Sequence, residues 1–436
     1  MPVMKNAGTN KLLLLQQPLG GLFNSTPINP AYHDEPRIVV RKAELGDVGA
    51  VWPEVGKRGH VTIRASGSGL DDESALIPAL AEGLERYSAC VYRAEQFVWA
   101  TGNELGEEAL DLDAVPKCSA SELAHPKCPL VIPDKSKPIR WVRGISLSNG
   151  RLVWIPVVMV YSQAGYAVPE ERFWISISTG CAAHTSYERA LLAGIYELVE
   201  RDILAIAWLQ QLALPRIEID IIPSSLASCW ERYKKALAGL EYIFFDATSD
   251  LGVPTAYGLQ VAPHNRRVTT LVACATGITM AEAIAKTMRD MVAIRPTFRK
   301  QRPVPESWDD FTDLLHGATF MARAESAPAF AFLTESPHIT RLSKIQNREA
   351  MNASLQSIVK RLGKKKMEIY VVDLTTDEGL RADMRVLRAI IPGLQPFSFR
   401  YRARFLGHPR LYLAPKAMGY ASRSEEQLNP WPQPFA

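Results

Sequence analysis

Two short stretches of the sequence carry the same acidic and basic residues at the same spacing. The first set is Glu82, Glu85 and Arg86, and the second set is Glu197, Glu200 and Arg201. Residues three and four apart share one face of an α-helix, so each stretch would present two carboxylates and a guanidinium together. Both stretches are otherwise rich in apolar residues, and we therefore expect the charged groups to lie near the core.

Buried carboxylates are costly unless they are paired or hold a metal ion. Two acidic helices that face each other suit a hard divalent cation such as Mg²⁺, which usually accompanies phosphate chemistry. The arginine that ends each set would then contact phosphate or orient the carboxylates. The alternative is an unrelated α/β protein in which each set forms ion pairs on a surface helix. The duplication favours the functional interpretation.

Each acidic helix follows a predicted strand and a glycine-containing loop. HVTIRASGSG leads into the first helix, and FWISISTG leads into the second. Strand, glycine loop and helix, in this order, can direct backbone N–H groups at an anion. Ser68 and Thr179 lie in the two loops, and we count both among the candidate cofactor-binding residues.

Further strands and helices are predicted along the chain. Asn149-Gly150 marks a hairpin turn, and strands are expected in RIVVRKAEL, LEYIFFDAT, PTAYGLQVA, RRVTTLVACATG and MEIYVVDLT. A third amphipathic helix, TMAEAIAKTMRDMVAIRPTFRK, carries Asp290 and Arg295. This alternation predicts an α/β or α+β fold in which helices cover mixed sheets.

The composition excludes several classes of protein. Hydrophobic residues make up 47% and charged residues 22% of the chain, as in ordinary globular proteins. A formal net charge of +4 over 436 residues gives no indication of nucleic-acid binding. Six scattered cysteines predict reduced thiols and no structural zinc. The longest apolar run, LVWIPVVMVY, is too short to span a membrane, so we expect a cytoplasmic protein.

The sequence ends in NPWPQPFA, where Pro430, Pro432 and Pro434 occupy alternate positions. Such a segment is extended and has few backbone donors. Proline-rich termini are commonly disordered. Trp431 and Phe435 nevertheless predict that this tail docks on the protein.

From about residue 60 onward the chain resembles the YcaO family, and in particular its azoline-forming cyclodehydratases of ribosomal peptide maturation. The resemblance rests on GSGLDDESALIPALAEGLERYSA, STGCAAHTSYERALLAGIYELVERD and the terminal Pro-x-Pro-x-Pro, in this order. It implies a YcaO-type fold that binds Mg²⁺ and ATP between the paired acidic helices. We divide the chain into a lead-in at 1–60, a YcaO catalytic domain at 61–425 and a proline-rich tail at 426–436.

The resemblance also implies roles for individual residues. It assigns magnesium to the four glutamates, and ATP contacts to the same glutamates together with Ser68, Arg86, Thr179, Arg201, Asp290 and Arg295. Pro430, Pro432 and Pro434 would lead the carboxylate of Ala436, as a catalytic group, into the active site. In the implied reaction, a Cys, Ser or Thr side chain attacks the preceding carbonyl and ATP phosphorylates its oxygen. Loss of phosphate then leaves a thiazoline or oxazoline.

The chain departs from the family pattern in two helices. Pro78 stands where the first helix often has serine, and Asp290 and Ala293 stand where the third helix usually has glutamate and glutamine. We therefore expect either altered ATP contacts or a weak ATPase that depends on a partner.

Partners are also implied. The roughly sixty residues before the resemblance are too few for a module that grips a leader peptide. We expect a precursor peptide substrate, a separate leader-peptide-binding protein and a flavin-dependent azoline dehydrogenase, with assembly as a homodimer or hetero-complex. Two alternatives remain open, namely a thioamide- or amidine-forming member of the family and a non-catalytic scaffold subunit of a maturation complex.

Overall fold

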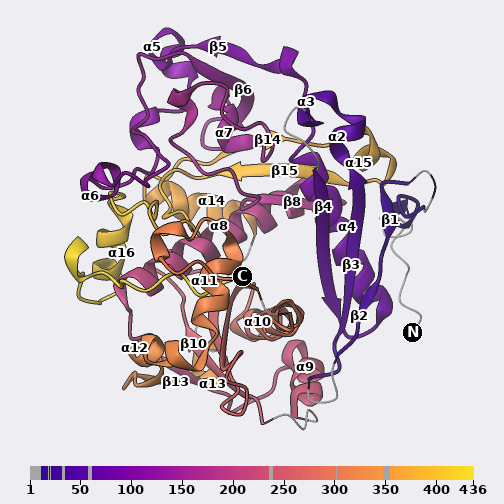
Figure 1. Cartoon of the computed structure of the whole chain (residues 1–436), viewed down its shortest axis with the longest axis vertical. Helices are drawn as coiled ribbons and strands as arrows, with labels where there is room; N and C mark the ends of the chain where they lie inside the picture. The colour runs from indigo at the N-terminus through magenta and orange to yellow at the C-terminus, as the bar shows by residue number, and fades with distance from the viewer. Residues whose placement is uncertain are drawn as a thin grey trace.

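The computed structural model describes residues 11–17, 19, 21–31, 35–56, 61–234, 239–300, 302–346 and 354–436. Within these ranges the chain forms three β-sheets with helices between and around them (Figure 1). This is the α+β arrangement of mixed sheets covered by helices that the sequence predicted.

The first sheet is built around β3 (Val39–Asp47), which confirms the strand expected in RIVVRKAEL. β3 pairs antiparallel with β1 (Phe23–Ser25), β2 (Ile28–Asn29) and β4 (Thr62–Gly69). β4 forms an edge of this sheet. The first acidic helix follows directly from that edge strand.

The second sheet has the order β5-β6-β14-β15-β8, with β7 paired to β6. Its strands are β5 (Val98–Ala100), β6 (Ile139–Ser146), β7 (Leu152–Pro156), β8 (Cys181–His184), β14 (Tyr370–Asp373) and β15 (Arg385–Ile390). β6 and β7 form the predicted hairpin, and Gly150 takes the positive φ of 71° that its turn requires.

The third sheet has the order β12-β11-β10-β9-β13. Its strands are β9 (Arg216–Glu218), β10 (Glu241–Asp246), β11 (Thr255–Val261), β12 (Thr270–Thr276) and β13 (Ile339–Arg341). β13 runs parallel to β9, whereas the other pairings are antiparallel. The predicted pairing of PTAYGLQVA with RRVTTLVACATG is therefore confirmed as β11 and β12.

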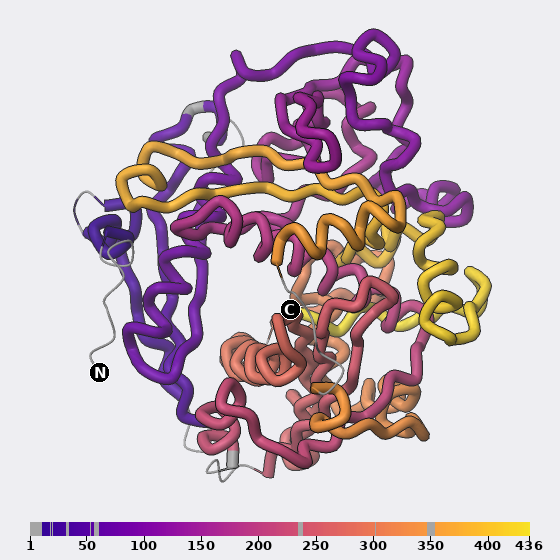
Figure 2. Tube along the Cα trace, turned by 180° about the vertical axis from the view of Figure 1, so that it is seen from behind, coloured from indigo at the N-terminus to yellow at the C-terminus, as the bar shows by residue number. Residues whose placement is uncertain are grey.

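Three helices lie between the sheets: α4 (Asp72–Ser88), α8 (Tyr187–Gln210) and α10 (Met280–Ile294). α4 packs on β3 and β4 and also contacts β8. α8 packs on β8 and β15 and contacts β12, whereas α10 packs on β11 and β12 and contacts β4. Each helix thus joins its own sheet to the next, and the three units close into a ring (Figures 1 and 2).

The remaining helices are shorter and lie around these elements. The α-helices are α2 (Val48–Val51), α3 (Pro53–Gly56), α5 (Gly102–Leu105), α6 (Ala120–Ala124), α7 (Val157–Val160), α9 (Ser224–Lys234), α11 (Leu314–Met321), α12 (Ala331–Thr334), α13 (Leu342–Gln346), α14 (Leu355–Lys364), α15 (Asp377–Arg381) and α16 (Arg410–Ala417). The 3-10 helices are η1 (Ala94–Gln96), η2 (Gly106–Glu108), η3 (Leu112–Ala114), η4 (Pro169–Glu171), η5 (Arg295–Phe298), η6 (Trp308–Asp310), η7 (Ala324–Phe330) and η8 (Glu425–Gln427).

The first predicted glycine loop is in fact strand, because Gly67 and Gly69 lie inside β4. A Cβ atom at Gly67 would lie 2.3 Å from the carbonyl oxygen of Ala75 in α4. The glycines therefore allow strand and helix to approach closely, which is a packing role rather than a loop role.

The strand predicted in FWISISTG was wrong, since β8 begins only after the glycine, at Cys181. The Cys181 N–H donates to the carbonyl of Ser178 at 2.8 Å, which closes a turn instead of continuing a strand. Gly180 takes a φ of 91° in this turn, a conformation that side chains disfavour. A Cβ there would also meet the carbonyl oxygen of Ala389 at 2.4 Å.

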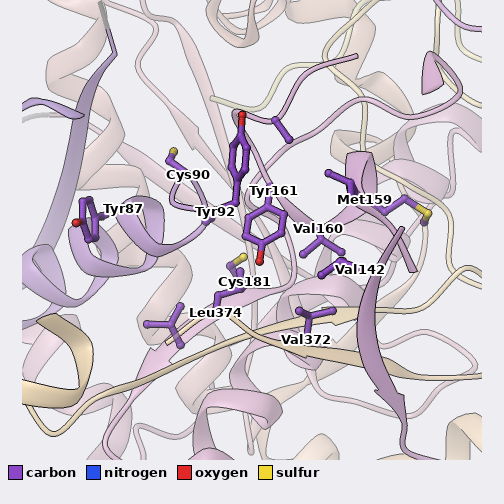
Figure 3. Close-up of a cluster of buried hydrophobic side chains, with 14 of the residues drawn as sticks. Tyr87, Cys90, Tyr92, Val142, Met159, Val160, Tyr161, Cys181, Val372 and Leu374 are labelled. Carbon is purple, nitrogen blue, oxygen red and sulfur yellow. The ribbon is translucent and has the colours of Figure 1, made fainter. Parts of the chain in front are cut away.

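One buried cluster joins the end of α4 to the second sheet. Tyr87 and Cys90 belong to the same cluster as Tyr161, Cys181 and Val372, which Figure 3 shows with them. Close packing of this kind makes the position of α4 sensitive to the second sheet. Among the described helices, none combines the length and hydropathy that a bilayer crossing requires.

The proline-rich tail is docked, as Trp431 and Phe435 predicted. Phe435 is only 3% exposed, and the Trp431 ring lies 5.4 Å from that of Trp308. Tyr401 donates to the carbonyl of Pro430 at 2.8 Å, which anchors the backbone of the tail.

Candidate active site

Glu82 and Arg86 of α4 cover the free edge of β4. The guanidinium of Arg86 lies 2.6 Å from the Glu82 carboxylate, which also accepts from the N–H of Ser66 at 2.9 Å. Arg86 donates in addition to the carbonyl of Arg64 at 2.8 Å. The first acidic set therefore satisfies backbone groups at an edge of the sheet.

The second set repeats this arrangement. Glu197 accepts from the N–H of Gly180 at 3.0 Å and lies 3.7 Å from the guanidinium of Arg201. In both sets the first glutamate accepts from the backbone that precedes its helix and pairs with the arginine four residues on. The repeat that the sequence shows in residue types thus extends to hydrogen bonds and ion pairs.

Glu200 connects α8 to the third sheet and to α10. Its side chain is buried, accepts from the N–H of Thr276 at 3.0 Å and lies 3.8 Å from Arg201. Lys286 of α10 donates to the same carboxylate at 3.2 Å. Lys286 was not among the residues predicted from the sequence, although its place four residues before Asp290 on the third helix was a usable signal.

The two acidic sets come together at Glu85 and Glu197. The pKa of Glu85 is raised well above its usual range, first by burial and then by the negative charges of Glu197 and Glu82. Burial also raises the pKa of Glu197, although Arg201 opposes the shift. Burial disfavours the charged form of both carboxylates, and a bound cation would stabilise that form.

Asp290 of α10 belongs to the same electrostatic cluster. Burial raises its pKa to about 6, Glu200 adds to the rise, and Lys286 opposes it. The structure therefore brings this predicted cofactor-binding residue to the second acidic set.

The donor set fits Mg²⁺ that arrives with phosphate. In the part of the chain that the structure describes, no three His, Cys, Asp or Glu side chains come close enough to hold a metal ion by themselves. Mg²⁺ is commonly bound by one or two carboxylates together with substrate phosphates and water, which this arrangement permits. The assignment of magnesium to Glu82, Glu85, Glu197 and Glu200 stays a prediction.

Of two other predicted cofactor residues, Thr179 lies beside the second acidic set, whereas Ser68 is placed only within the first sheet. Ser68 is half-buried in β4, opposite Val40 of β3. Thr179 lines a small cavity of about 40 Å³ together with Arg201 and Phe397.

Arg295 is placed apart from the glutamates. It is buried in η5, donates to the side chain of Gln260 at 2.6 Å and lies 3.9 Å from Glu35. These contacts tie it to the third sheet and to the segment before β3. Its assignment to ATP rests on the family pattern alone.

Arg388 of β15 is a second residue that the sequence analysis missed. It is buried, donates to the carbonyl of Ile177 at 2.7 Å and lies 3.3 Å from the Cys181 sulfur. Its charge opposes the rise in the pKa of Glu85. An arginine inside the apolar run RVLRAIIPG was the signal that could have identified it.

The tail reaches the second acidic set through Phe397. The ring of Phe397 lies 5.7 Å from the guanidinium carbon of Arg201 and 6.3 Å from the ring of Phe435. Phe435 also packs edge-on against Tyr257, at 5.4 Å. Ala436 follows and packs against an apolar cluster that includes Phe298, just beyond α10.

The three prolines of the tail lie in the segment that leads to Phe435. Pro432 lines a small cavity with Trp208 and Tyr401, and the Pro430 carbonyl accepts from Tyr401. Pro434 lies between Gln433, which donates to the Leu314 carbonyl at 3.3 Å, and the buried Phe435. The predicted catalytic roles of the prolines and of Ala436 remain predictions.

Curated relatives share part of this sequence. A protein of Rhizobium leguminosarum bv. trifolii, described as an uncharacterized protein in the tfuA 3′ region, is 29% identical over 47% of each chain. An uncharacterized protein of Methanothermobacter thermautotrophicus is 24% identical over 78% of this chain and 83% of its own.

Solved structures share the fold. A heterocyclase in complex with substrate and cofactor matches with a TM-score of 0.80 and 22% identity, over 98% of this chain and 57% of its own. The heterocyclase TruD matches with a TM-score of 0.64 and 22% identity, over 82% and 50%. YcaO from Methanopyrus kandleri, bound with AMPPCP and Mg²⁺, matches with a TM-score of 0.60 and 15% identity, over 87% of each chain. The chain thus spans about half the length of the Rhizobium relative and of both heterocyclases.

A family model described as YcaO cyclodehydratase, binding ATP and Mg²⁺, matches residues 66–395. This range begins at Ser66, which donates to Glu82, and ends at Gln395, and it contains both acidic sets and α10. The chain therefore belongs to the YcaO cyclodehydratase family, a family of ATP- and Mg²⁺-binding enzymes.

Proposed function

We propose that this chain is an ATP-dependent cyclodehydratase that converts Cys, Ser or Thr residues of a ribosomal precursor peptide into thiazolines or oxazolines. The observation that supports this most strongly is the meeting of the two acidic sets at Glu85 and Glu197. The docked tail beside Arg201 is the second support.

The reaction needs a way to expel an amide oxygen, which is a poor leaving group. A side-chain thiol or hydroxyl adds to the preceding carbonyl carbon, and the resulting oxygen takes the terminal phosphoryl group of ATP. That oxygen then leaves as phosphate while a C=N bond forms, so each ring loses the atoms of one water. When bound, Mg-ATP supplies the phosphoryl group and offsets the charge that develops on it.

The residues of this chain would bind and orient. Glu82, Glu85, Glu197 and Glu200 would hold Mg²⁺ together with phosphate oxygens. Arg86 and Arg201 are already oriented by Glu82 and Glu197, at 2.6 and 3.7 Å, and would contact phosphate from fixed positions.

The tail would complete the peptide side of the site. Phe435 packs on Tyr257 of β11, and Tyr257 lies opposite Cys274 of β12. Burial raises the pKa of the Cys274 thiol, and Cys274 lies close enough to Glu200 for the carboxylate to add to the rise. Ala436 follows Phe435 and packs beside Ile294 and Phe298, at the C-terminal end of α10. Its carboxylate would accept a proton from the attacking side chain or from the amide nitrogen.

The substrate would be presented by a separate leader-peptide-binding protein, and a flavin-dependent dehydrogenase would oxidise the azolines further. A solved relative of the same fold is described as part of the E. coli microcin synthetase McbBCD complex. The proposal of a multiprotein assembly rests on that similarity of fold and on the family resemblance.

The test is the mass change of a precursor peptide encoded beside this chain, incubated with the chain, its neighbouring gene products and Mg-ATP. We expect a loss of about 18 Da for each Cys, Ser or Thr modified, with one ATP consumed per ring. Omitting the neighbouring gene products tests the need for a partner.

Two outcomes would contradict the proposal. An exchange of oxygen for sulfur when sulfide is supplied, without the loss of water, would assign the chain to the thioamide-forming branch. An unchanged peptide with no ATP consumed in the complete mixture would favour a scaffold subunit.

A further inference from the structure

A cluster of cationic side chains lies just beyond the C-terminal end of α10. Five of them line a hollow of about 370 Å³, together with Phe298 and Glu325: Arg266, Arg267, Lys300, Arg302 and Arg323. A neighbouring hollow of about 330 Å³ shares Arg267 and Phe298 with the first and adds Arg295, Arg299 and Glu35. We call these two hollows together the basic patch.

The positive charge of the basic patch is poorly compensated. Glu325 lies 3.4 Å from Arg266, and Glu35 pairs with Arg299. Among the residues that the structure describes, Arg267, Lys300, Arg302 and Arg323 form no ion pair with a carboxylate. Arg267 and Arg302 are both exposed to solvent. The charge of Arg323 also acts on Glu325, whose pKa it helps to lower. The cations that remain uncompensated at this place repel one another, and an anionic ligand would remove this repulsion.

The excess of charge is local. The patch holds seven cationic and two acidic side chains, whereas the formal net charge of the whole chain is +4. The remainder of the chain is therefore close to neutral. A field concentrated in this way steers an anionic ligand to one place on the surface.

The basic patch adjoins the end of the tail. Phe298, which lines both hollows, belongs to the apolar cluster against which Ala436 packs. Ile294 of α10 and Ala318 of α11 belong to the same cluster. The C-terminus is drawn beside α10 and α11 in Figure 1. A peptide whose modified residue lies beside Ala436 would thus place the residues next to it over the basic patch.

We propose that the basic patch binds an acidic segment of the substrate peptide, next to the residue that is modified. This inference rests on the proposed function, which supplies a peptide at the tail. Glutamate and aspartate side chains match the exposed guanidinium and ammonium groups of the patch, and arginine binds carboxylates in a bidentate manner. An acidic stretch beside a cyclised residue is therefore the sequence feature that this enzyme selects.

Direct binding can be measured without catalysis. The probe is a fluorescein-labelled hexaglutamate peptide, titrated with the full chain and followed by fluorescence anisotropy at two salt concentrations. We expect the peptide to bind, and to bind more weakly at high salt because the exposed charges are screened. The double variant Arg267→Glu/Arg302→Glu should weaken binding at least tenfold.

The control carries the same change of charge elsewhere. Arg172 and Lys416 are exposed basic residues outside the patch, so Arg172→Glu/Lys416→Glu matches the test variant in net charge. It should bind hexaglutamate nearly as the unmodified chain does. Equal loss in both variants, or no loss in either, would overturn the inference. Tighter binding of a ten-residue oligothymidylate than of hexaglutamate would overturn it too, since the patch would then be a nucleic-acid site.

Failure of this inference and failure of the proposed function are distinguishable. If the basic patch fails but the function holds, the unmodified chain cyclises its peptide although the patch variant binds hexaglutamate normally. If the function fails but the patch holds, hexaglutamate binding is lost in the patch variant although no peptide loses water.

Discussion

Lys286 of α10 donates to the buried carboxylate of Glu200 in α8, at 3.2 Å. The negative charge of Glu200 is the main cause of the raised pKa of Lys286, so this lysine remains a cation at the site. α10 is the helix in which Asp290 and Ala293 replace the residues usual in the family. It nevertheless delivers a positive charge to the second acidic set, where we propose that ATP binds.

Replacing Lys286 by methionine should weaken both the fold and the binding of Mg-ATP. Glu200 would lose a charged partner in a buried place, although the Lys286 side chain is itself 44% exposed. We expect a loss of about 1–3 kcal/mol in the free energy of unfolding, below the range for a fully buried pair. A double-mutant cycle with Glu200→Gln, followed by urea unfolding, checks this. Additive effects of the two substitutions would show that the pair does not couple.

Replacing Glu82 by glutamine should abolish ATP turnover with little effect on stability. Glu82 is partly exposed, so its ion pair with Arg86 contributes only about 0–1 kcal/mol to folding. Loss of the carboxylate, in contrast, would remove one of the ligands that we propose for Mg²⁺. The matched control is Glu188→Gln, an exposed glutamate in the first turn of α8. Phosphate release and thermal unfolding of both variants are the measurements, and normal turnover in Glu82→Gln would refute its role.

Removing residues 432–436 should abolish cyclisation, and the structure adds a cost in stability. Phe435 is buried against Tyr257 and Phe397, and truncation of a buried phenylalanine costs about 3–5 kcal/mol.

Extending Ala436 by Gly-Ser separates the two effects, since it moves the carboxylate but keeps Phe435 in place. We expect this variant to unfold like the unmodified chain and to cyclise poorly. Peptide mass and thermal unfolding test it, and full activity would exclude a catalytic carboxylate at Ala436.

Asp290 should make the protein less stable as the pH rises. Burial raises its folded-state pKa to about 6, so between the unfolded pKa and this value the folded state binds more protons than the unfolded state. The free energy of unfolding therefore falls as the pH rises through this interval, by up to about 3 kcal/mol from this group. In Asp290→Asn this part of the fall should disappear. Urea unfolding of both proteins from about pH 4 to about pH 7 is the test, and parallel curves would contradict it.

Local patterns in the sequence were sufficient to predict the acidic helices. Glu82 and Glu197 each share a helical face with residues three and four positions on, which the helical repeat of 3.6 residues predicts. Asn149-Gly150 predicts a hairpin turn because both residues readily adopt positive φ. Neither inference required knowledge of distant parts of the chain.

Contacts between distant segments explain what was missed. Gly67 was assigned to a loop because nothing in its own neighbourhood of the sequence explains the glycine. The explanation is Ala75 of α4, whose carbonyl oxygen leaves no room for a side chain at this position. Lys286 and Arg388 gained significance only once the fold had placed them beside Glu200 and Cys181. Side chains selected by such partners leave little trace in local periodicity.

The ring of three strand–helix units has a consequence for how the chain folds. β4 ends at Gly69 and α10 begins at Met280, so the contact between them closes a loop of about 210 residues. Loop closure over such a length is entropically unfavourable, and contacts of this kind slow folding. We therefore expect the α10–β4 junction to form last and to open first. A ligand that contacts α4, α8 and α10 together would stabilise the α10–β4 contact and slow the unfolding of the whole chain.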